Sequence, residues 1–140
     1  MNPNLEKMNN YLDNINMRHQ TINDNCAIML GNTEKIKGVQ FILYFKDIKD
    51  GPLQYAQIQV HKLCEFPEEK KEIIFRLCSE LNKTYCGISF YVKEDINAIT
   101  VNVRATATTE LVAEDIYSEI ISMVRCIDEA YPLIMKEIWS

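Results

Sequence analysis

The sequence predicts an α+β fold with the element order α-β-β-β-α-β-β-α and one antiparallel five-stranded sheet covered on one face by helices. Two observations support this prediction. Segments in which apolar and polar residues alternate, as is typical of half-buried strands, occur first as a group of three and then as a group of two. Segments with apolar residues at helical spacing precede, separate and follow these groups. Grouped strands joined by short turns favour antiparallel pairing over a parallel βαβ arrangement.

The N-terminal half of the chain is expected to form one helix and three strands. Apolar residues recur at helical spacing over residues 4–19, which predicts the helix. Apolar runs or strict alternation predict strands over residues 26–30, 38–46 and 55–63. Asp50-Gly51 is typical of a hairpin turn between the last two of these strands. The residues expected to share the buried face of those two strands are Phe41, Leu43, Phe45, Ala56, Ile58 and Val60.

The C-terminal half begins with a second helix. Pro67 suits the first helical turn, and the glutamates that follow it interact favourably with the helix dipole. The polar residues 82–84 are expected to end this helix. Alternating apolar residues then predict two strands, over residues 87–93 and 98–106, on either side of an acidic turn.

A long amphipathic helix is predicted over residues 110–139, with Thr108 or Thr109 as its cap. At 1.5 Å per residue it would be about 45 Å long, which exceeds the width of one small domain. Because Pro132 lies inside it, either the helix kinks or a second helix begins there. The apolar stripe continues past the proline, so its end is expected to contact a partner. The predicted contact residues are Tyr131, Ile134, Met135, Ile138 and Trp139.

Length and composition predict one domain over residues 1–140 in a reducing compartment. A chain of 140 residues has the size of a single domain, and five scattered cysteines cannot all pair with one another. The net charge of −5 disfavours binding to nucleic acid. We see no apolar signal segment, and the longest apolar run, over residues 41–45, is too short to span a bilayer. We therefore expect a soluble, cytoplasmic protein that binds neither nucleic acid nor membranes.

The motifs of common catalytic and metal sites are absent from the sequence. His61 and Cys64 have a spacing that could supply two zinc ligands, but further ligands are missing, and an odd offset on a strand places the two side chains on opposite faces. There is no nucleophile elbow, calcium loop or phosphate-binding glycine loop. Cys78 and Cys126 lie on or beside the helical stripes, where core packing is the simpler interpretation. We therefore expect no catalytic residue, no metal and no cofactor.

Surface residues are the remaining candidates for function. On the faces of the predicted strands opposite the core, tyrosine and isoleucine mix with glutamine, as in a sheet that binds a peptide or protein. An ordinary half-exposed sheet also has this composition, since apolar atoms cover much of any protein surface. The candidate residues on this face are Ile42, Tyr44, Gln57, Gln59 and Tyr91.

Two segments resemble the YbjN family, a group of bacterial domains assigned as candidate sensory transduction regulators. One is the helix end over residues 77–82 with the strand, acidic turn and strand that follow it. The other is the helix over residues 114–135, which contains Asp128-Glu129-Ala130-Tyr131-Pro132. The resemblance implies a fold similar to that of the type III secretion chaperones. It also implies a homodimer that is not an enzyme and binds other proteins or peptides.

The sequence thus favours a non-enzymatic protein- or peptide-binding domain, chaperone-like or regulatory, that forms a homodimer. One alternative is a small-molecule-binding or enzymatic α+β domain with a pocket between sheet and helices, in which His61 or a cysteine would lie beside a carboxylate. Another is a structural subunit with a permanent partner.

Overall fold

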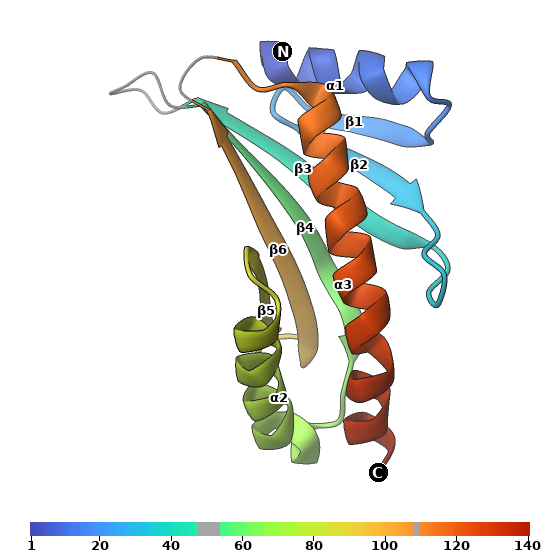
Figure 1. Cartoon of the computed structure of the whole chain (residues 1–140), viewed down its shortest axis with the longest axis vertical. Coiled ribbons are helices and arrows are strands. Elements are labelled where there is room, and N and C mark those ends of the chain that lie inside the picture. Colours follow the sequence, from blue (N-terminus) through green and yellow to red (C-terminus); the bar gives the residue numbers. More distant parts are fainter. Residues whose placement is uncertain (48–53, 108–109) are drawn as a thin grey trace.

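The computed structural model describes residues 1–47, 54–107 and 110–140. It is an α+β structure with three α-helices and one antiparallel sheet (Figure 1). The elements are α1 (Pro3–Asn14), β1 (His19–Asn23), β2 (Cys26–Gly31), β3 (Val39–Asp47), β4 (Gln54–Glu65), the 3-10 turn η1 (Glu68–Lys70), α2 (Lys71–Thr84), β5 (Ile88–Lys93), β6 (Ala98–Ala107) and α3 (Ala113–Trp139).

The sheet has six strands in the order β1-β2-β3-β4-β6-β5, so the prediction of five strands is wrong. The additional strand is β1, which lies at the edge and pairs with β2 from His19 opposite Met29 onward. Its residues are mostly exposed, so no apolar alternation indicates a strand. The predicted first helix is correspondingly too long. It ends at Asn14, and Asn16 adopts a left-handed backbone with φ of 58°, which asparagine tolerates better than most residues.

All three helices cover the same face of the sheet, as the sequence predicted. The long α3 runs down this face with the strands behind it, α1 lies across its upper end near β1 and β2, and α2 lies over the β5 edge (Figure 1). The sheet side chains that the helices bury include those predicted for β3 and β4, together with residues of β5 and β6. They are Phe41, Leu43, Phe45, Ala56, Ile58, Val60, Ile88, Phe90, Val101 and Val103.

The helix α3 is continuous from Ala113 to Trp139, so no second helix begins at Pro132. Pro132 is exposed, and its missing N–H leaves the helical carbonyl four residues earlier without its usual donor. The predicted caps Thr108 and Thr109 lie outside the described residues. The C-terminal end of α3 lies beside α2 and η1, where Lys70 Nζ donates a hydrogen bond of 2.7 Å to the carbonyl oxygen of Ser140 (Figure 1). None of the helices in the described part of the chain is both long and apolar enough to cross a membrane.

Candidate functional site

The C-terminal residues predicted to contact a partner do not form one exposed surface. Ile134 is 0% exposed and Ile138 5% exposed, and both pack in the core between helices and sheet. These two residues are therefore part of the folded core, which corrects the prediction that they contact a partner. Tyr131 and Met135 are half-buried, while Trp139 is 81% exposed. Contact with a partner through these three residues stays a prediction.

The five candidates on the sheet lie together on the face opposite the helices. In the pairing of β3 with β4, Ile42 is opposite Gln59 and Tyr44 is opposite Gln57. Gln59 Nε2 donates a hydrogen bond of 2.8 Å to the hydroxyl of Tyr91 on β5, across the intervening strand β6. Tyr44 and Tyr91 remain 39% and 40% exposed. The structure thus brings these residues into one patch, which we call the open sheet face.

Polar contacts within the open sheet face occupy part of its hydrogen-bonding capacity. The hydroxyl of Tyr55 donates to Gln57 Oε1 at 2.9 Å, and Gln57 in turn donates to the side-chain oxygen of Asn102. The guanidinium of Arg104 lies 5.5 Å from the centre of the Tyr55 ring, within cation–π distance. The glutamines are therefore already engaged within the sheet, and the apolar and aromatic side chains are the groups most free to contact a partner.

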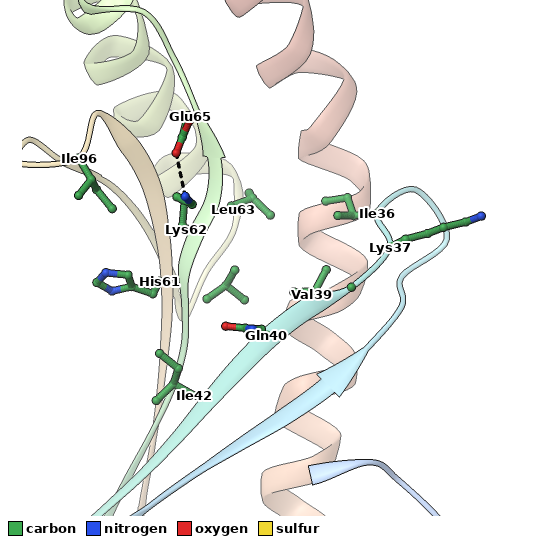
Figure 2. A pocket seen from close by; sticks show the side chains of 12 residues that line it. Ile36, Lys37, Val39, Gln40, Ile42, His61, Lys62, Leu63, Glu65 and Ile96 are labelled. Atoms are coloured by element: carbon green, nitrogen blue, oxygen red, sulfur yellow. Dashed lines mark hydrogen bonds and ion pairs between the residues drawn. The ribbon is translucent and has the colours of Figure 1, made fainter. Parts of the chain in front are cut away.

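A second candidate site lies where β3 and β4 separate. Their pairing runs from Asp47 opposite Gln54 to Ile42 opposite Gln59 and then stops. Both strands continue beyond that point, because β3 begins at Val39 and β4 extends to Glu65. The two strands diverge here, with α3 behind them (Figure 2). We call this opening the β3–β4 cleft.

A bulge in β4 explains the divergence. On the other side of β4, Val60 is opposite Val101, but the next pair joins Cys64 to Ile99, so β4 has more residues than β6 over this stretch. A bulge of this kind bends its strand and increases the local twist. Because the bulge directly follows Gln59, which is in the last pair with β3, it turns β4 away from β3.

The β3–β4 cleft has a volume of about 650 Å³. This is within the size range of small-ligand sites. In Figure 2, Gln40 points from β3 toward β4, whereas the Lys37 side chain points outward from the turn before β3. The apolar part of the lining comes from both strands and from two turns. It consists of Ile36, Val39, Ile42, Val60, Leu63 and Ile96.

The charged groups of the β3–β4 cleft are few. Lys62 Nζ lies 2.7 Å from Glu65 Oε1, so these two charges balance each other. Lys37 adds a positive charge at the rim, and no ion pair of Lys37 is seen within the described residues. His61 also lines the cavity, but within the same residues no ion pair joins its ring to a carboxylate. The arrangement therefore shows a polar rim around apolar walls.

The thiols of the core have properties that suit packing. Burial raises the pKa of Cys64 to about 12, with a contribution from neighbouring Cys78, and burial raises the pKa of Cys78 to about 11. A thiol that stays protonated is a poor nucleophile and a poor metal ligand. Among the described residues, no group of three or more histidine, cysteine, aspartate or glutamate residues could hold a metal ion. Cys86 is exposed.

The sequence interpretation missed the β3–β4 cleft, although one signal was present. Val60 and Leu63 are both buried, but an offset of three residues would place them on opposite faces of a regular strand. Such a break in alternation indicates a bulge. The position at which two strands stop pairing, however, depends on twist and cannot be obtained from alternation alone.

Comparison with known proteins gives a fold. No family model matches the chain, and no curated protein sequence matches it. Among solved structures, the chain is similar to the crystal structure of YbjN, "a putative transcription regulator from E. coli", with 13% sequence identity, a TM-score of 0.62 and 93% of each chain covered. The further likeness to type III secretion chaperones stays an expectation. The chain therefore has a YbjN-like fold.

Proposed function

We propose that the protein is a non-enzymatic domain that binds other proteins or peptides, in a chaperone-like or regulatory role, and that it acts as a homodimer. The open sheet face is the observation that carries this proposal. Tyr44 and Tyr91 are exposed there beside half-buried Ile42, and no helix of the described chain covers them. Exposed aromatic residues grouped with apolar ones and surrounded by polar side chains are typical of protein interfaces.

A regulatory role agrees with the description of the similar structure, YbjN, as a transcription regulator, although that description concerns YbjN itself. The net charge of −5 disfavours direct contact with nucleic acid. We therefore propose that regulation by this chain acts through protein partners.

The β3–β4 cleft supports a second candidate function, the binding or conversion of a small molecule. His61 and Glu65 both line this cavity, which is the kind of pocket that an enzymatic domain would need. Glu65 is paired with Lys62, however, which leaves it less suited to orient a catalytic histidine. A structural role in a larger assembly is a third candidate, and copurification of a partner at fixed stoichiometry would favour it.

Size-exclusion chromatography with light scattering tests the homodimer. The wild-type protein should have twice the chain mass of 16.3 kDa. Replacement of Tyr44 and Tyr91 together by glutamate should give a monomer. Dimerisation through the open sheet face would then bury the negative charges of both protomers without partners. Phe75→Glu is the control, since Phe75 is a similarly exposed aromatic residue on α2.

The outcomes separate the parts of the proposal. A wild-type monomer at high concentration would contradict the homodimer. A dimer that survives the tyrosine substitutions would exclude the open sheet face as its interface. If Trp139→Ser alone gives a monomer, the interface lies at the C-terminal end of α3 instead.

A further inference from the structure

We infer that the β3–β4 cleft accepts a short extended segment of another protein, which adds to the sheet as a strand on the wall formed by β3. This inference rests on the proposed protein-binding function and specifies one site and one form of partner. It begins from the hydrogen-bond ladder. On one side, Val39, Gln40 and Phe41 pair with Gly31, Leu30 and Met29 of β2, but on the other side no strand within the described residues pairs with them.

The cleft therefore creates an edge inside the sheet. Successive residues of a strand direct their backbone groups to opposite neighbours. Phe45 N–H donates to Asn25 on the β2 side, so Val39 and Phe41 also face β2, and Gln40 directs its N–H and C=O toward the cleft. Unpaired strand edges are templates for an added strand. The edge of β3 is regular, because its pairing with β2 continues without a shift from Cys26–Tyr44 to Gly31–Val39.

The opposite wall plays a different role. The bulge between Val60 and Cys64 places β4 out of regular register, so this wall is a poor template for a ladder. It supplies side chains instead, among them Leu63 on the side of the helices. The segment is thus expected to pair with β3 through its backbone and to place apolar side chains against β4.

The lining limits the chemistry of the segment. Because side chains of a strand alternate between faces, a segment of about four residues would place alternate apolar side chains against Val39 and Leu63. Gln40 points across the cleft, and its amide makes no hydrogen bond within the described residues, so it can bond to the peptide backbone (Figure 2). Lys37 at the rim adds an uncompensated positive charge in a chain of net charge −5, which favours an acidic residue flanking the segment.

The test starts from random ten-residue peptides displayed on phage and selected on the purified full-length protein. The enriched peptides should contain alternating apolar residues with an acidic flank. Fluorescence anisotropy of a labelled synthetic peptide then gives the affinity. Gln40→Ala should weaken binding about fivefold through loss of one hydrogen bond. Gln20→Ala, which changes an exposed glutamine of β1, should leave the affinity unchanged.

Charge and backbone pairing are tested separately. Lys37→Glu should weaken binding about threefold. Lys136→Glu, which makes the same charge change on the exposed surface of α3, should have no effect. Peptides carrying a single backbone N-methyl group, moved one residue at a time, should lose affinity at every second position, because only alternate N–H groups of an added strand face β3.

Amide hydrogen exchange locates the bound peptide. Protection that increases at the Gln40 amide, together with the alternating effect of N-methylation, would support the inference. Peptides that bind but protect the open sheet face around Tyr44 and Tyr91 would overturn it and leave the proposed protein-binding function intact. The inference would also be overturned if no peptide were enriched. It would likewise be overturned if the enriched peptides resembled segments of this chain and increased protection outside the β3–β4 cleft. The proposed function would then depend on the light-scattering result.

Discussion

Asn82 joins the end of α2 to the edge strand β5 through both backbone groups of Phe90. Its Nδ2 donates a hydrogen bond of 2.9 Å to the Phe90 carbonyl, and its Oδ1 accepts one of 2.7 Å from the Phe90 N–H. A carboxamide presents a donor and an acceptor side by side, so this one side chain pairs with β5 as a neighbouring strand would. The contact holds α2 against the sheet edge and satisfies backbone groups at that edge.

Asn82→Ala should therefore destabilise the protein by about 1–3 kcal/mol, because both partners on Phe90 lose a hydrogen bond. Urea unfolding followed by circular dichroism measures this change. Ser79→Ala, at an exposed position of the same helix, is the control and should change stability by less than about 0.5 kcal/mol. Equal urea midpoints for Asn82→Ala and Ser79→Ala would mean that the contact between Asn82 and Phe90 contributes nothing to the free energy of unfolding.

Asp128 on α3 fixes the turn between β2 and β3. Its carboxylate accepts hydrogen bonds from the Thr33 hydroxyl at 2.6 Å, the Glu34 N–H at 3.1 Å and the Lys35 N–H at 3.2 Å. Asp128→Ala should cost about 1–3 kcal/mol, with Glu119→Ala as a charge-matched control on the same helix. Since the turn continues into the lining of the β3–β4 cleft, Asp128→Ala should also weaken the selected peptide, whereas Glu119→Ala should not.

Removal of the chain after Tyr131 should unfold the protein. The deletion takes Ile134 and Ile138 out of the core, at about 2–5 kcal/mol for each buried isoleucine. A domain of this size is stable by only about 5–15 kcal/mol. Trp139→Ser should leave the melting temperature nearly unchanged, because the side chain is 81% exposed. A large loss of stability in Trp139→Ser would show that this residue packs on the fold.

The half-buried thiol of Cys64 predicts a decrease in stability at alkaline pH. The folded-state pKa of Cys64 is about 12, above the ordinary value of 9.0, so the neutral thiol stabilises the folded state below pH 9. That contribution is lost as the pH rises from 9 toward 12, because the unfolded chain then releases a proton that the folded chain keeps. The slope is at most about 1.4 kcal/mol per pH unit for one thiol. Urea unfolding at several pH values should show a smaller slope for Cys64→Ala than for the wild type.

The thiol reagent DTNB provides an independent check at pH 8. In the folded protein, Cys86 should react rapidly because it is exposed, while Cys78 should stay protected by burial and by its raised pKa of about 11. Rapid modification of Cys78 under native conditions would contradict its place in the core.

The sequence predicted well what burial determines. The alternation in β3 and β4 identified Phe41, Leu43 and Ile58 as core residues, because one sheet face meets the helices and the other does not. The edge strand β1 escaped prediction because backbone pairing with β2 holds it, and its side chains carry no apolar pattern. Ile134 was predicted to contact a partner but lies in the core. Its apolar pattern is clear, but an apolar stripe does not reveal whether it packs against the same chain or against a partner.

The resemblance to YbjN rested on residues with structural roles. Asn82 and Asp128, which belong to the segments that carry the resemblance, each join a helix to the sheet or to its turn. Residues of this kind indicate a fold and say little about a ligand. The β3–β4 cleft depends instead on the bulge after Val60, whose effect on strand direction appears only in three dimensions.

Amide hydrogen exchange of the free protein, resolved by residue, is the most direct test of the internal sheet edge. The account predicts that the amide of Gln40 exchanges rapidly, as an unpaired edge group does, while the amides of Val39 and Phe41, which face β2, and of residues 43–45, paired on both sides, exchange slowly. Uniformly slow exchange along the whole of β3 would contradict it, because β3 and β4 would then be paired throughout and there would be no edge for a partner to join.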